Sequence, residues 1–422
     1  MYKQSKYNII VPHGDIFILY NTATSAILEL NQEYHTKFSS SNWQKFTQEE
    51  IKMLHEQGFL KFYDHDEDFY QSLLRNSAIS KNMGGITALT ILPTTECNAR
   101  CAYCYQSGIK KESMQEETVD TLIAFIQKYI SSEKKLSISW FGGEPLLEHD
   151  KITRICKALE KENIIIKSNM ISNGSLFTEE LIQNAKSIWH LNKVQITIDG
   201  LEEDYNLIKN YTNIDNAFHK VINVIKLLLN NNINVSVRVN FEYENVNKAF
   251  TSLEWLQESF GGNKGFHLYA HPIYDKIDKY VCDNPEEHIL YKMYLKDINC
   301  GKCNFNDLMK PKEIFCGAMI YNSFYVSPNG KLYLCYNTES LKPGEDVGNI
   351  WTGPVLNQAY KKWSSAQLDY EECKNCVLLP CCQGGCKATY LYEGRTPCVL
   401  YKPFYKELIK LIYEKSIEEC HP

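Results

Sequence analysis

The stretch Thr94-Thr-Glu-Cys-Asn-Ala-Arg-Cys-Ala-Tyr-Cys-Tyr105 decides how this chain is interpreted. Its cysteines, Cys97, Cys101 and Cys104, have the spacing C-x3-C-x2-C, with Tyr103 directly before the third. Thiolates this close together can hold three corners of a cubane iron–sulfur cluster, and the pattern supplies no fourth ligand. An iron without a protein ligand is an open site, so the stretch indicates a cluster that binds something. A structural zinc site needs four ligands, and no further His or Cys follows at zinc-finger spacing, so zinc and free structural thiols rank lower.

The totals of the sequence restrict the class of partner. The 422 residues are enough for two or three domains with substantial cores. The formal net charge of −6 and the lack of a dense Lys/Arg block argue against nucleic acid or an anionic membrane as main partner. No apolar stretch is long enough to span a membrane, and the first residues do not form a secretory signal. We expect a cytoplasmic protein with no nucleic-acid and no membrane partner.

The sixteen cysteines are grouped along the chain. Three lie at 97–104 and eleven lie between Cys300 and Cys420. In a reducing compartment such groups indicate metal ligands rather than disulfides. Cys156 and Cys282 stand apart, and we expect them to be buried apolar fillers.

Residues 1–85 are expected to form a small separate unit. Three stretches have the composition of short strands: 7–12, 15–20 and 59–63. His13-Gly14 is a plausible hairpin turn between the first two. Thr47 and Glu50 have the spacing of a capping box, which predicts a helix from there to Gly58. The order strand, strand, helices, strand predicts a winged-helix-like domain.

A repeated β–α pattern begins at Ile86 and predicts the class of the main fold. Six apolar stretches have strand character: 87–92, 136–141, 164–171, 194–198, 235–241 and 265–270. Helix-period stretches lie between them, at 116–130, 152–160 and 217–229 among others. The pattern predicts an α/β fold with a parallel sheet, and six units rather than eight predict a partial (β/α)6 barrel over residues 86–300. Ligands of such sheets bind at the carboxyl ends of the strands, where the cysteine stretch lies.

Polar motifs follow the later strands. Trp140-Phe-Gly-Gly-Glu-Pro145 follows the second strand; its glycines allow close approach of a ligand, and its carboxylate suits an ammonium group. Ser172 and Asn173 follow the third strand, although an ordinary Asn-Gly turn is an alternative for Asn173. Arg238 and Asn240 on the fifth strand share one face, so both are expected to point into the barrel. A lone histidine, His271, follows the sixth strand and is more often structural.

C-x3-C-x2-C with an aromatic residue before the last cysteine, followed one β–α unit later by Gly-Gly-Glu-Pro, resembles the radical SAM superfamily. The resemblance implies a 4Fe-4S cluster on Cys97, Cys101 and Cys104 that binds and cleaves S-adenosylmethionine. The residues it implies for contact with S-adenosylmethionine are Tyr103, Gly142, Gly143, Glu144, Ser172, Asn173 and Arg238, the last as partner of the cofactor carboxylate.

The cysteines of residues 301–422 resemble the SPASM domain, which carries two auxiliary 4Fe-4S clusters. The resemblance implies seven ligands: Cys316, Cys335 and Cys386 for the first cluster, and Cys373, Cys376, Cys382 and Cys398 for the second. Together with the S-adenosylmethionine-binding cluster this gives three 4Fe-4S clusters. Cys300 or Cys303 could be a fourth ligand of the first auxiliary cluster, or that cluster could have an open iron. Cys381 and Cys420 lie outside the pattern.

The combination of these parts resembles radical SAM peptide maturases. It implies hydrogen abstraction from a ribosomally made precursor peptide, a thioether or carbon–carbon crosslink as product, and an external one-electron reductant. The N-terminal unit resembles domains that hold a leader peptide at a sheet edge, with a solubilising or dimerising appendage as alternative. An anaerobic sulfatase-maturating enzyme would have an acidic base after the second SPASM cysteine, where this chain has Tyr336 and Asn337. A peptide epimerase and a non-catalytic iron–sulfur electron-transfer scaffold are the remaining alternatives.

Overall fold

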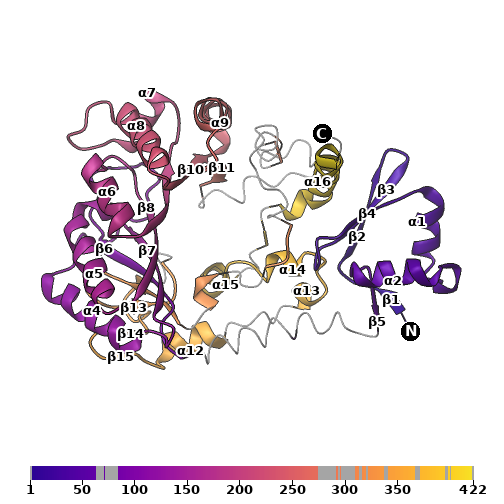
Figure 1. Ribbon diagram of the computed structural model, residues 1–422, viewed down its shortest axis with the longest axis horizontal. Coiled ribbons are helices and arrows are strands. Elements are labelled where there is room, and N and C mark those ends of the chain that lie inside the picture. Colours follow the sequence, from indigo (N-terminus) through magenta and orange to yellow (C-terminus); the bar gives the residue numbers. More distant parts are fainter. Residues whose placement is uncertain are drawn as a thin grey trace.

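The computed structural model describes residues 2–62, 71, 84–273, 291–292, 295, 309–312, 316–319, 322–336, 341–365, 371–394, 398–399 and 401–420. An N-terminal body and a larger sheet-and-helix body lie at opposite ends, and C-terminal elements lie between them (Figure 1). No helix in the described part of the chain is long and apolar enough to cross a membrane.

The described part of the N-terminal body, residues 2–62, contains two small sheets and two α-helices. Its elements are β1 Tyr2–Gln4, β2 Asn8–His13, β3 Ile16–Asn21, β4 Ile27–Leu30, α1 Gln32–Ser39, the 3-10 helix η1 Trp43–Lys45, α2 Gln48–Glu56 and β5 Leu60–Phe62. β2, β3 and β4 form an antiparallel sheet in that order, and β1 pairs with β5. The expected hairpin is confirmed, since His13 pairs with Ile16 across the turn. Both hydrogen bonds of the capping box between Thr47 and Glu50 are present as well.

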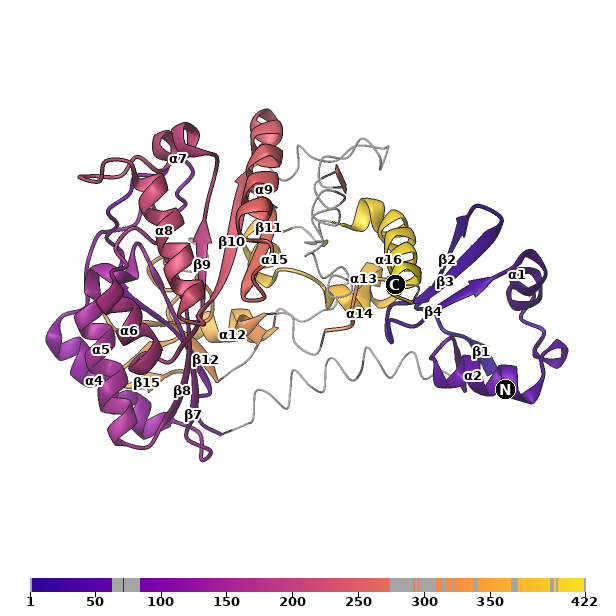
Figure 2. The same cartoon turned by 45° about the horizontal axis from the view of Figure 1, so that its top comes forward.

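The large body is the expected α/β fold. Its six parallel strands are β6 Ala88–Thr94, β7 Lys135–Gly142, β8 Ile165–Ile171, β9 Leu191–Thr197, β10 Asn234–Phe241 and β11 Phe266–Pro272. The helices that follow them are α4 Glu116–Tyr129, η2 Pro145–Glu148, α5 His149–Lys161, α6 Glu179–Ser187, α7 Glu202–Lys209, α8 Ala217–Asn230, η3 Tyr243–Asn245 and α9 Val246–Phe260. The strands lie in chain order from β6 to β11, which makes a partial barrel with the helices outside (Figure 2).

Side-chain periodicity explains why these segments form these elements. Along β7, buried side chains alternate with more exposed ones, so one face of the strand packs in the core. On α5 the buried residues are Ile152, Ile155, Cys156 and Leu159, the i, i+3, i+4, i+7 stripe of a helix packed on a sheet. Cys156 is fully buried in this stripe, as expected for an apolar filler.

The C-terminal third extends the same sheet, which the sequence did not predict. β12 Ser323–Val326 pairs parallel with β6, and β13 Leu332–Tyr333 pairs antiparallel with β12. The eight-stranded sheet therefore contains residues from both segments expected as separate units, 86–300 and 301–422. By pairing with β6, β12 covers an edge that would otherwise leave backbone groups unpaired.

The remaining C-terminal elements are short, apart from the last helix. They are η6 Gly317–Met319, β14 Gly348–Asn349, β15 Gly353–Pro354, α12 Gln358–Ser365, α13 Glu371–Lys374, α14 Leu379–Cys382, α15 Lys387–Glu393, η8 Lys402–Phe404 and α16 Tyr405–Cys420. α16 packs against β2 and β3.

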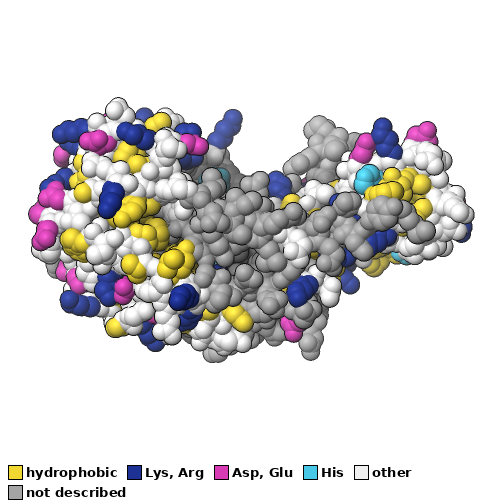
Figure 3. All heavy atoms as spheres, turned by 90° about the horizontal axis from the view of Figure 1, so that it is seen from below, with side chains coloured by type: hydrophobic (Ala, Val, Ile, Leu, Met, Phe, Trp, Pro, Cys, Tyr) yellow, Lys and Arg dark blue, Asp and Glu magenta, His cyan; other side chains and the backbone are white. Residues whose placement is uncertain are grey.

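Hydrogen bonds join the N-terminal body to the cysteine-rich segment. The Tyr20 hydroxyl donates to the Met309 carbonyl at 3.1 Å, and the Thr22 hydroxyl donates to the carbonyl of Val377. The Tyr413 hydroxyl on α16 donates to a carboxylate oxygen of Glu29 on β4 at 2.5 Å. On the face shown in Figure 3, basic and acidic side chains are interspersed over the large body, in line with the lack of a Lys/Arg block in the sequence.

Candidate cofactor site and cysteine groups

The three cysteines of the first motif lie on the loop after β6, at the carboxyl end of the sheet. Cys97, Cys101 and Cys104 are free thiols, each partly exposed. The loop is tightly turned, because the Cys104 N–H donates to the Cys101 carbonyl at 3.1 Å and the Ala99 N–H donates to Cys97 Sγ at 3.4 Å. Burial raises the pKa of the Cys97 and Cys101 thiols, so they need a bound cation to hold them as thiolates.

No three His, Cys, Asp or Glu side chains in the described part of the chain come close enough to hold a single metal ion. A 4Fe-4S cluster is ligated differently, because each thiolate bonds a different iron atom and the sulfurs stay further apart than around one ion. Three partly exposed thiols on one loop fit that ligand set.

Backbone hydrogen bonds hold the Gly-Gly-Glu-Pro motif against the cysteine loop. The Gly143 N–H donates to the Thr94 carbonyl at 3.1 Å, and the Glu144 N–H donates to the Glu96 carbonyl at 2.8 Å. A Cβ atom at Gly142, whose φ is +125°, would lie 2.1 Å from the Thr94 oxygen; one at Gly143 would lie 2.0 Å from the Glu96 oxygen. The expected reason for these glycines was close approach to a ligand, whereas the close neighbour in the structure is the backbone of the cysteine loop.

The Glu144 carboxylate is fully buried and accepts three hydrogen bonds. Oε1 accepts from the Leu146 N–H at 3.1 Å and from the Ser172 hydroxyl at 2.9 Å, and Oε2 accepts from the Asn173 N–H at 2.7 Å. Burial raises the pKa of Glu144 to about 7 against these bonds, which act to lower it. The carboxylate thus ties the end of β7 to the end of β8, and its contact with an ammonium group stays a prediction.

Asn173 joins the end of β8 to the cysteine loop. Its Nδ2 donates to Asn98 Oδ1 at 2.8 Å and lies 3.8 Å from Cys97 Sγ. The structure therefore brings Cys97, Glu144, Ser172 and Asn173 together in one connected group, although the sequence placed them after three different strands.

Arg238 lies on β10 with the partners that strand alternation predicted. Its Nε donates to Asn240 Oδ1 at 2.7 Å, so the two side chains share a face as expected. Its Nη2 lies 3.0 Å from His271 Nδ1. Burial, with a smaller contribution from Arg238, lowers the pKa of His271 to about 4, so this imidazole is neutral at pH 7.

Sequence reasoning missed a buried ion pair beside the cysteine loop. Lys209 Nζ, at the end of α7, lies 2.7 Å from Asp199 Oδ2, and it donates to the Tyr103 hydroxyl at 2.8 Å. A lysine in the last turn of an amphipathic helix is typical of an exposed position, so no local signal indicated its burial. Asp199 lies two residues after the end of β9 and belongs to none of the sequence motifs described above.

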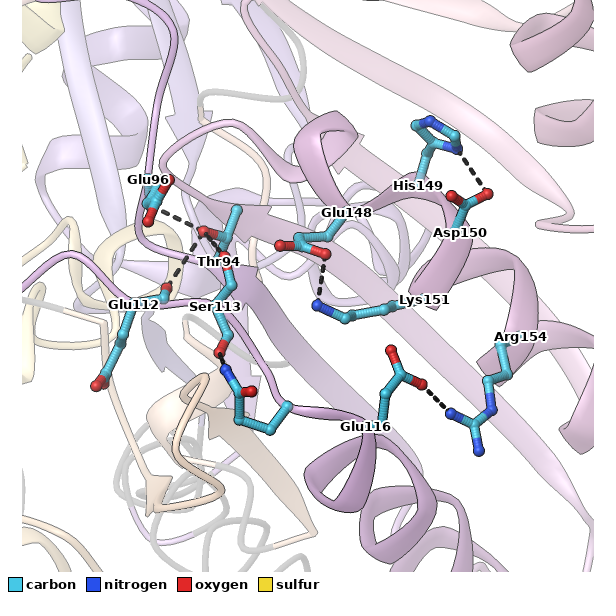
Figure 4. A network of polar contacts seen from close by, with 11 residues as sticks. Thr94, Glu96, Glu112, Ser113, Glu116, Glu148, His149, Asp150, Lys151 and Arg154 are labelled. Carbon is cyan, nitrogen blue, oxygen red and sulfur yellow. Dashed lines mark hydrogen bonds and ion pairs between the residues drawn. The ribbon is translucent and has the colours of Figure 1, made fainter.

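Side-chain hydroxyls fix the base of the cysteine loop, as Figure 4 shows. The Ser113 hydroxyl donates to Thr94 Oγ1 at 2.7 Å, and the Glu96 N–H donates to the same oxygen at 2.9 Å. Thr94 Oγ1 in turn donates to the Glu112 carbonyl at 3.2 Å. The segment before α4 therefore packs against the start of the loop and holds the backbone just before Cys97 in place.

The four cysteines expected at the second auxiliary cluster line one cavity. Cys373, Cys376, Cys382 and Cys398 all contribute to its wall. Lys402 also lines the cavity, and its Nζ donates to Cys398 Sγ at 3.2 Å. Four thiols around one cavity beside an ammonium group fit the ligand set of a cluster with negative charge.

The other C-terminal cysteines are only partly covered by the structure. Burial, and to a smaller extent the neighbouring Cys386, raise the pKa of the Cys316 thiol, which puts these two near each other. Cys300, Cys303 and Cys282 lie outside the described residues. Cys381, expected outside the ligand pattern, is fully buried, and its Sγ donates to the Met309 carbonyl at 2.8 Å.

Four aromatic rings form a group around Tyr336, and one of them, Tyr105, lies near both Cys104 and Cys335. The Tyr336 ring centroid is 5.3 Å from that of Phe141, 5.3 Å from that of Tyr325 and 6.4 Å from that of Tyr105. Tyr105 and Tyr336 are 45% and 43% exposed, so two of these rings present surface next to the cysteine loop. The sequence had singled out Tyr336 only as the residue that stands where an acidic base would be expected.

The partial barrel and its cysteine loop define an iron–sulfur enzyme of the α/β-barrel class. Residues 91–256 match the model of the Radical SAM superfamily, so the chain contains a radical SAM domain and is similar to radical SAM enzymes. A radical SAM domain implies S-adenosylmethionine and a 4Fe-4S cluster as cofactors.

Three similar proteins match most of the length of this chain. The radical SAM cyclopropyl synthase TigE of Paramaledivibacter caminithermalis is 24% identical over 79% of this chain and 77% of its own length. The structure of anSMEcpe with bound AdoMet, at 20% identity, covers 79% of this chain and 98% of its own with a TM-score of 0.61. Streptococcus suis SuiB bound to its precursor peptide SuiA, at 13% identity, covers 94% and 98% with a TM-score of 0.51. These two structures show a shared fold.

Proposed function

We propose that this enzyme is a peptide maturase that forms a thioether or carbon–carbon crosslink in a ribosomally made precursor. One observation carries the proposal: the cysteine loop, Gly-Gly-Glu and the Ser172-Asn173 turn form a single hydrogen-bonded unit at the carboxyl end of the barrel. The fold likeness to SuiB, solved with a precursor peptide and covering 94% of this chain, supports a peptide as substrate. The likeness to TigE supports bond formation as the kind of reaction.

We assign each cofactor a set of residues that would hold it. Cys97, Cys101 and Cys104 would ligate a 4Fe-4S cluster, and the two C-terminal cysteine groups would ligate two more. When bound and reduced, the first cluster supplies the electron that splits S-adenosylmethionine into methionine and a radical able to remove a hydrogen atom from a C–H bond. Arg238 would pair with the cofactor carboxylate, and Tyr103, Gly142, Gly143, Glu144, Ser172 and Asn173 would form the wall around the cofactor.

The chain's own residues hold and enclose the reacting groups. Glu144 fixes the ends of β7 and β8 relative to the cysteine loop, so the cofactor wall has one geometry before substrate binds. The rings of Tyr105 and Tyr336 lie beside the loop, where they would limit the access of water to a bound cofactor and substrate. His271, neutral at pH 7, adds no second positive charge beside Arg238, and the Arg238 guanidinium would bind the carboxylate of the cofactor.

A crosslink removes two hydrogens from the peptide for each bond formed. One leaves as an atom from a C–H bond, taken by the radical derived from S-adenosylmethionine. The other leaves as a proton from a thiol or a second C–H group, and the remaining electron goes to a one-electron acceptor. Iron–sulfur groups on the C-terminal cysteines would be acceptors of the right class, and an external reductant would supply the first electron.

Residues 1–85 would hold the leader of the precursor, residues 86–300 would form the catalytic barrel, and residues 301–422 the auxiliary cluster domain. The sheet β2-β3-β4 has β3 in its centre, so β2 and β4 are edge strands to which an extended leader could add. A cytoplasmic location, where thiols stay reduced, suits the many free cysteines.

An anaerobic sulfatase-maturating enzyme is the second candidate, favoured by the fold likeness to anSMEcpe. It is less well supported because Tyr336, a half-exposed ring packed among aromatic neighbours, stands where the acidic base is expected. A phenol does not substitute for a carboxylate as a base at pH 7.

Reductive cleavage of S-adenosylmethionine tests the enzymatic class. The protein, reconstituted anaerobically with iron and sulfide and reduced with dithionite, is expected to release 5′-deoxyadenosine, whereas Cys97→Ala is expected to release none. Wild-type protein without this product, or a Cys97→Ala variant that matches wild type, would instead support a non-catalytic iron–sulfur scaffold.

A further inference from the structure

The buried pair of Lys209 and Asp199 has no role in the function proposed above. Their side chains are only 4% and 2% exposed, and the ammonium nitrogen lies 2.7 Å from the carboxylate oxygen. Removing two charges from water is unfavourable for each ion, and a buried pair rarely repays this in stability. A pair retained at this cost next to a functional loop calls for a functional explanation.

The pair is bonded directly to the cysteine loop. Tyr103, between Cys101 and Cys104, donates its hydroxyl to Asp199 Oδ2 and accepts from Lys209 Nζ at 2.8 Å. The backbone repeats the connection, since the Arg100 N–H donates to the Lys209 carbonyl at 2.9 Å. The end of α7 is therefore bonded to the loop through both side chains and backbone.

The surroundings hold each charge in a fixed place. Asp199 Oδ1 accepts from the Asn240 N–H at 3.2 Å, which anchors the carboxylate to β10. Lys209 Nζ lies 5.4 Å from the centroid of the Tyr103 ring and 5.9 Å from that of Tyr205. Such a dry, aromatic environment lets a charge act over a longer range than water would.

Both charges of the pair reach the cysteine loop through Tyr103. Lys209 places a positive charge and Asp199 a negative charge on the hydroxyl of this loop residue. Charges of opposite sign have opposite effects on a neighbouring group that gains an electron.

We propose that Lys209 raises the reduction potential of the cluster held by Cys97, Cys101 and Cys104, with Asp199 and Tyr103 as the residues that position its ammonium group. Reduction adds one electron, and a fixed cation nearby stabilises the more negative state. The electron needed to cleave S-adenosylmethionine then enters at a less negative potential. The inference rests on the cluster assignment in the proposed function.

Redox titration followed by electron paramagnetic resonance tests this without peptide substrate. The variants are Lys209→Met, Lys209→Arg, Asp199→Asn and the double variant Lys209→Met/Asp199→Asn, each reconstituted and assayed for iron and acid-labile sulfide. To keep one signal, the C-terminal clusters are removed by Cys376→Ala and Cys386→Ala in every protein. Lys248→Met is the matched control. Lys248 on α9 pairs at 2.6 Å with Asp204, which lies on the same helix as Lys209, but the Lys248 side chain is 65% exposed.

The two single variants are expected to shift the midpoint potential in opposite directions. Lys209→Met lowers it, Asp199→Asn raises it, the double variant shifts it less than Lys209→Met does, and Lys209→Arg and Lys248→Met leave it unchanged. Shifts of the same sign in both single variants, or no shift in either, would mean a purely structural pair and overturn the inference. If Lys209→Met takes up no iron, the test rests on Asp199→Asn alone: a higher midpoint potential supports the inference, and an unchanged or lower one overturns it. A parent protein that binds no iron would refute the cluster assignment itself.

Discussion

Glu144 and Asn173 are joined across two neighbouring strand ends, with the Asn173 N–H 2.7 Å from Glu144 Oε2. This bond and the one from Asn173 to Asn98 connect the second motif, the third strand end and the cysteine loop. Because the Glu144 carboxylate is fully buried, its protonation must affect the stability of this unit.

The metal-free protein is expected to lose stability as the pH rises from about 4.5 to about 7. The pKa of Glu144 is raised from 4.5 to about 7, so in this range the folded protein keeps a proton that the unfolded chain has released. At about 1.4 kcal/mol for each pH unit, the contribution is on the order of 3 kcal/mol. Urea unfolding across this range measures it. Glu144→Gln, which does not titrate, should remove this part of the pH dependence, and an identical profile in both proteins would contradict the assignment.

Gly143→Ala is expected to displace the cysteine loop. A methyl group there would meet the Glu96 oxygen at 2.0 Å, and neither backbone can yield without breaking the bond from Glu144 to Glu96. We expect a stability loss of about 1–3 kcal/mol and a clear drop in iron bound on reconstitution. Gly262→Ala is the control, because a Cβ at Gly262 meets nothing within 4 Å. Full iron content in Gly143→Ala would show that the loop tolerates the shift.

Each group of cysteine ligands is expected to hold its own share of the bound iron. Cys97→Ala and Cys376→Ala are each expected to lose about four irons, one cluster each, because their thiols belong to different groups. Cys381→Ala is expected to retain all iron, since its Sγ bonds the Met309 carbonyl. Iron and sulfide assays together with Mössbauer spectra give the count. Iron loss in Cys381→Ala equal to that in Cys376→Ala would contradict the ligand set.

Tyr336 should affect peptide modification more than cofactor cleavage. It packs against Phe141 and Tyr325 and stays half exposed, which is typical of a substrate-facing ring. Tyr336→Ala is expected to lower crosslinked product at least tenfold while 5′-deoxyadenosine still forms, and Tyr336→Phe should retain both. Equal loss of both products in Tyr336→Ala would indicate a structural role, and a strong loss in Tyr336→Phe would point to chemistry at the hydroxyl.

Leader binding should protect an edge strand of the N-terminal sheet. An added strand bonds the free backbone groups of β2 or β4, so amide hydrogen exchange should slow there. The central strand β3, already paired on both sides, is the internal control. Deleting residues 1–85 is a poor test because Tyr20 and Thr22 bond the C-terminal segment. Exchange that is unchanged at saturating leader would refute recognition by this sheet.

The sequence predicted the features of the fold and site that depend on local residue patterns. Strand and helix periods located the six β–α units, and the spacing of Cys97, Cys101 and Cys104 located the loop. It could not predict relationships set by pairing between distant segments. β12 has four residues and pairs with a strand more than two hundred positions earlier in the chain. Lys209 is buried only because Asp199 and Tyr103, from two other segments, meet it.

The same limit explains why the role of two glycines was only partly predicted. Gly142 and Gly143 indicated that another group approaches the backbone closely, but the sequence does not identify that group. The structure supplies the Thr94 and Glu96 carbonyls as the neighbours.

Tandem mass spectrometry of a precursor peptide after anaerobic turnover tests the central claim most directly. A short cysteine-containing open reading frame next to this gene would supply the peptide, incubated with the reconstituted enzyme, S-adenosylmethionine and dithionite. A crosslinking maturase yields a peptide lighter by two hydrogens for each bond, with fragments that place the link between two residues. A mass that is unchanged in ordinary water but rises by one deuterium in heavy water would mean epimerisation and would contradict the proposed crosslink.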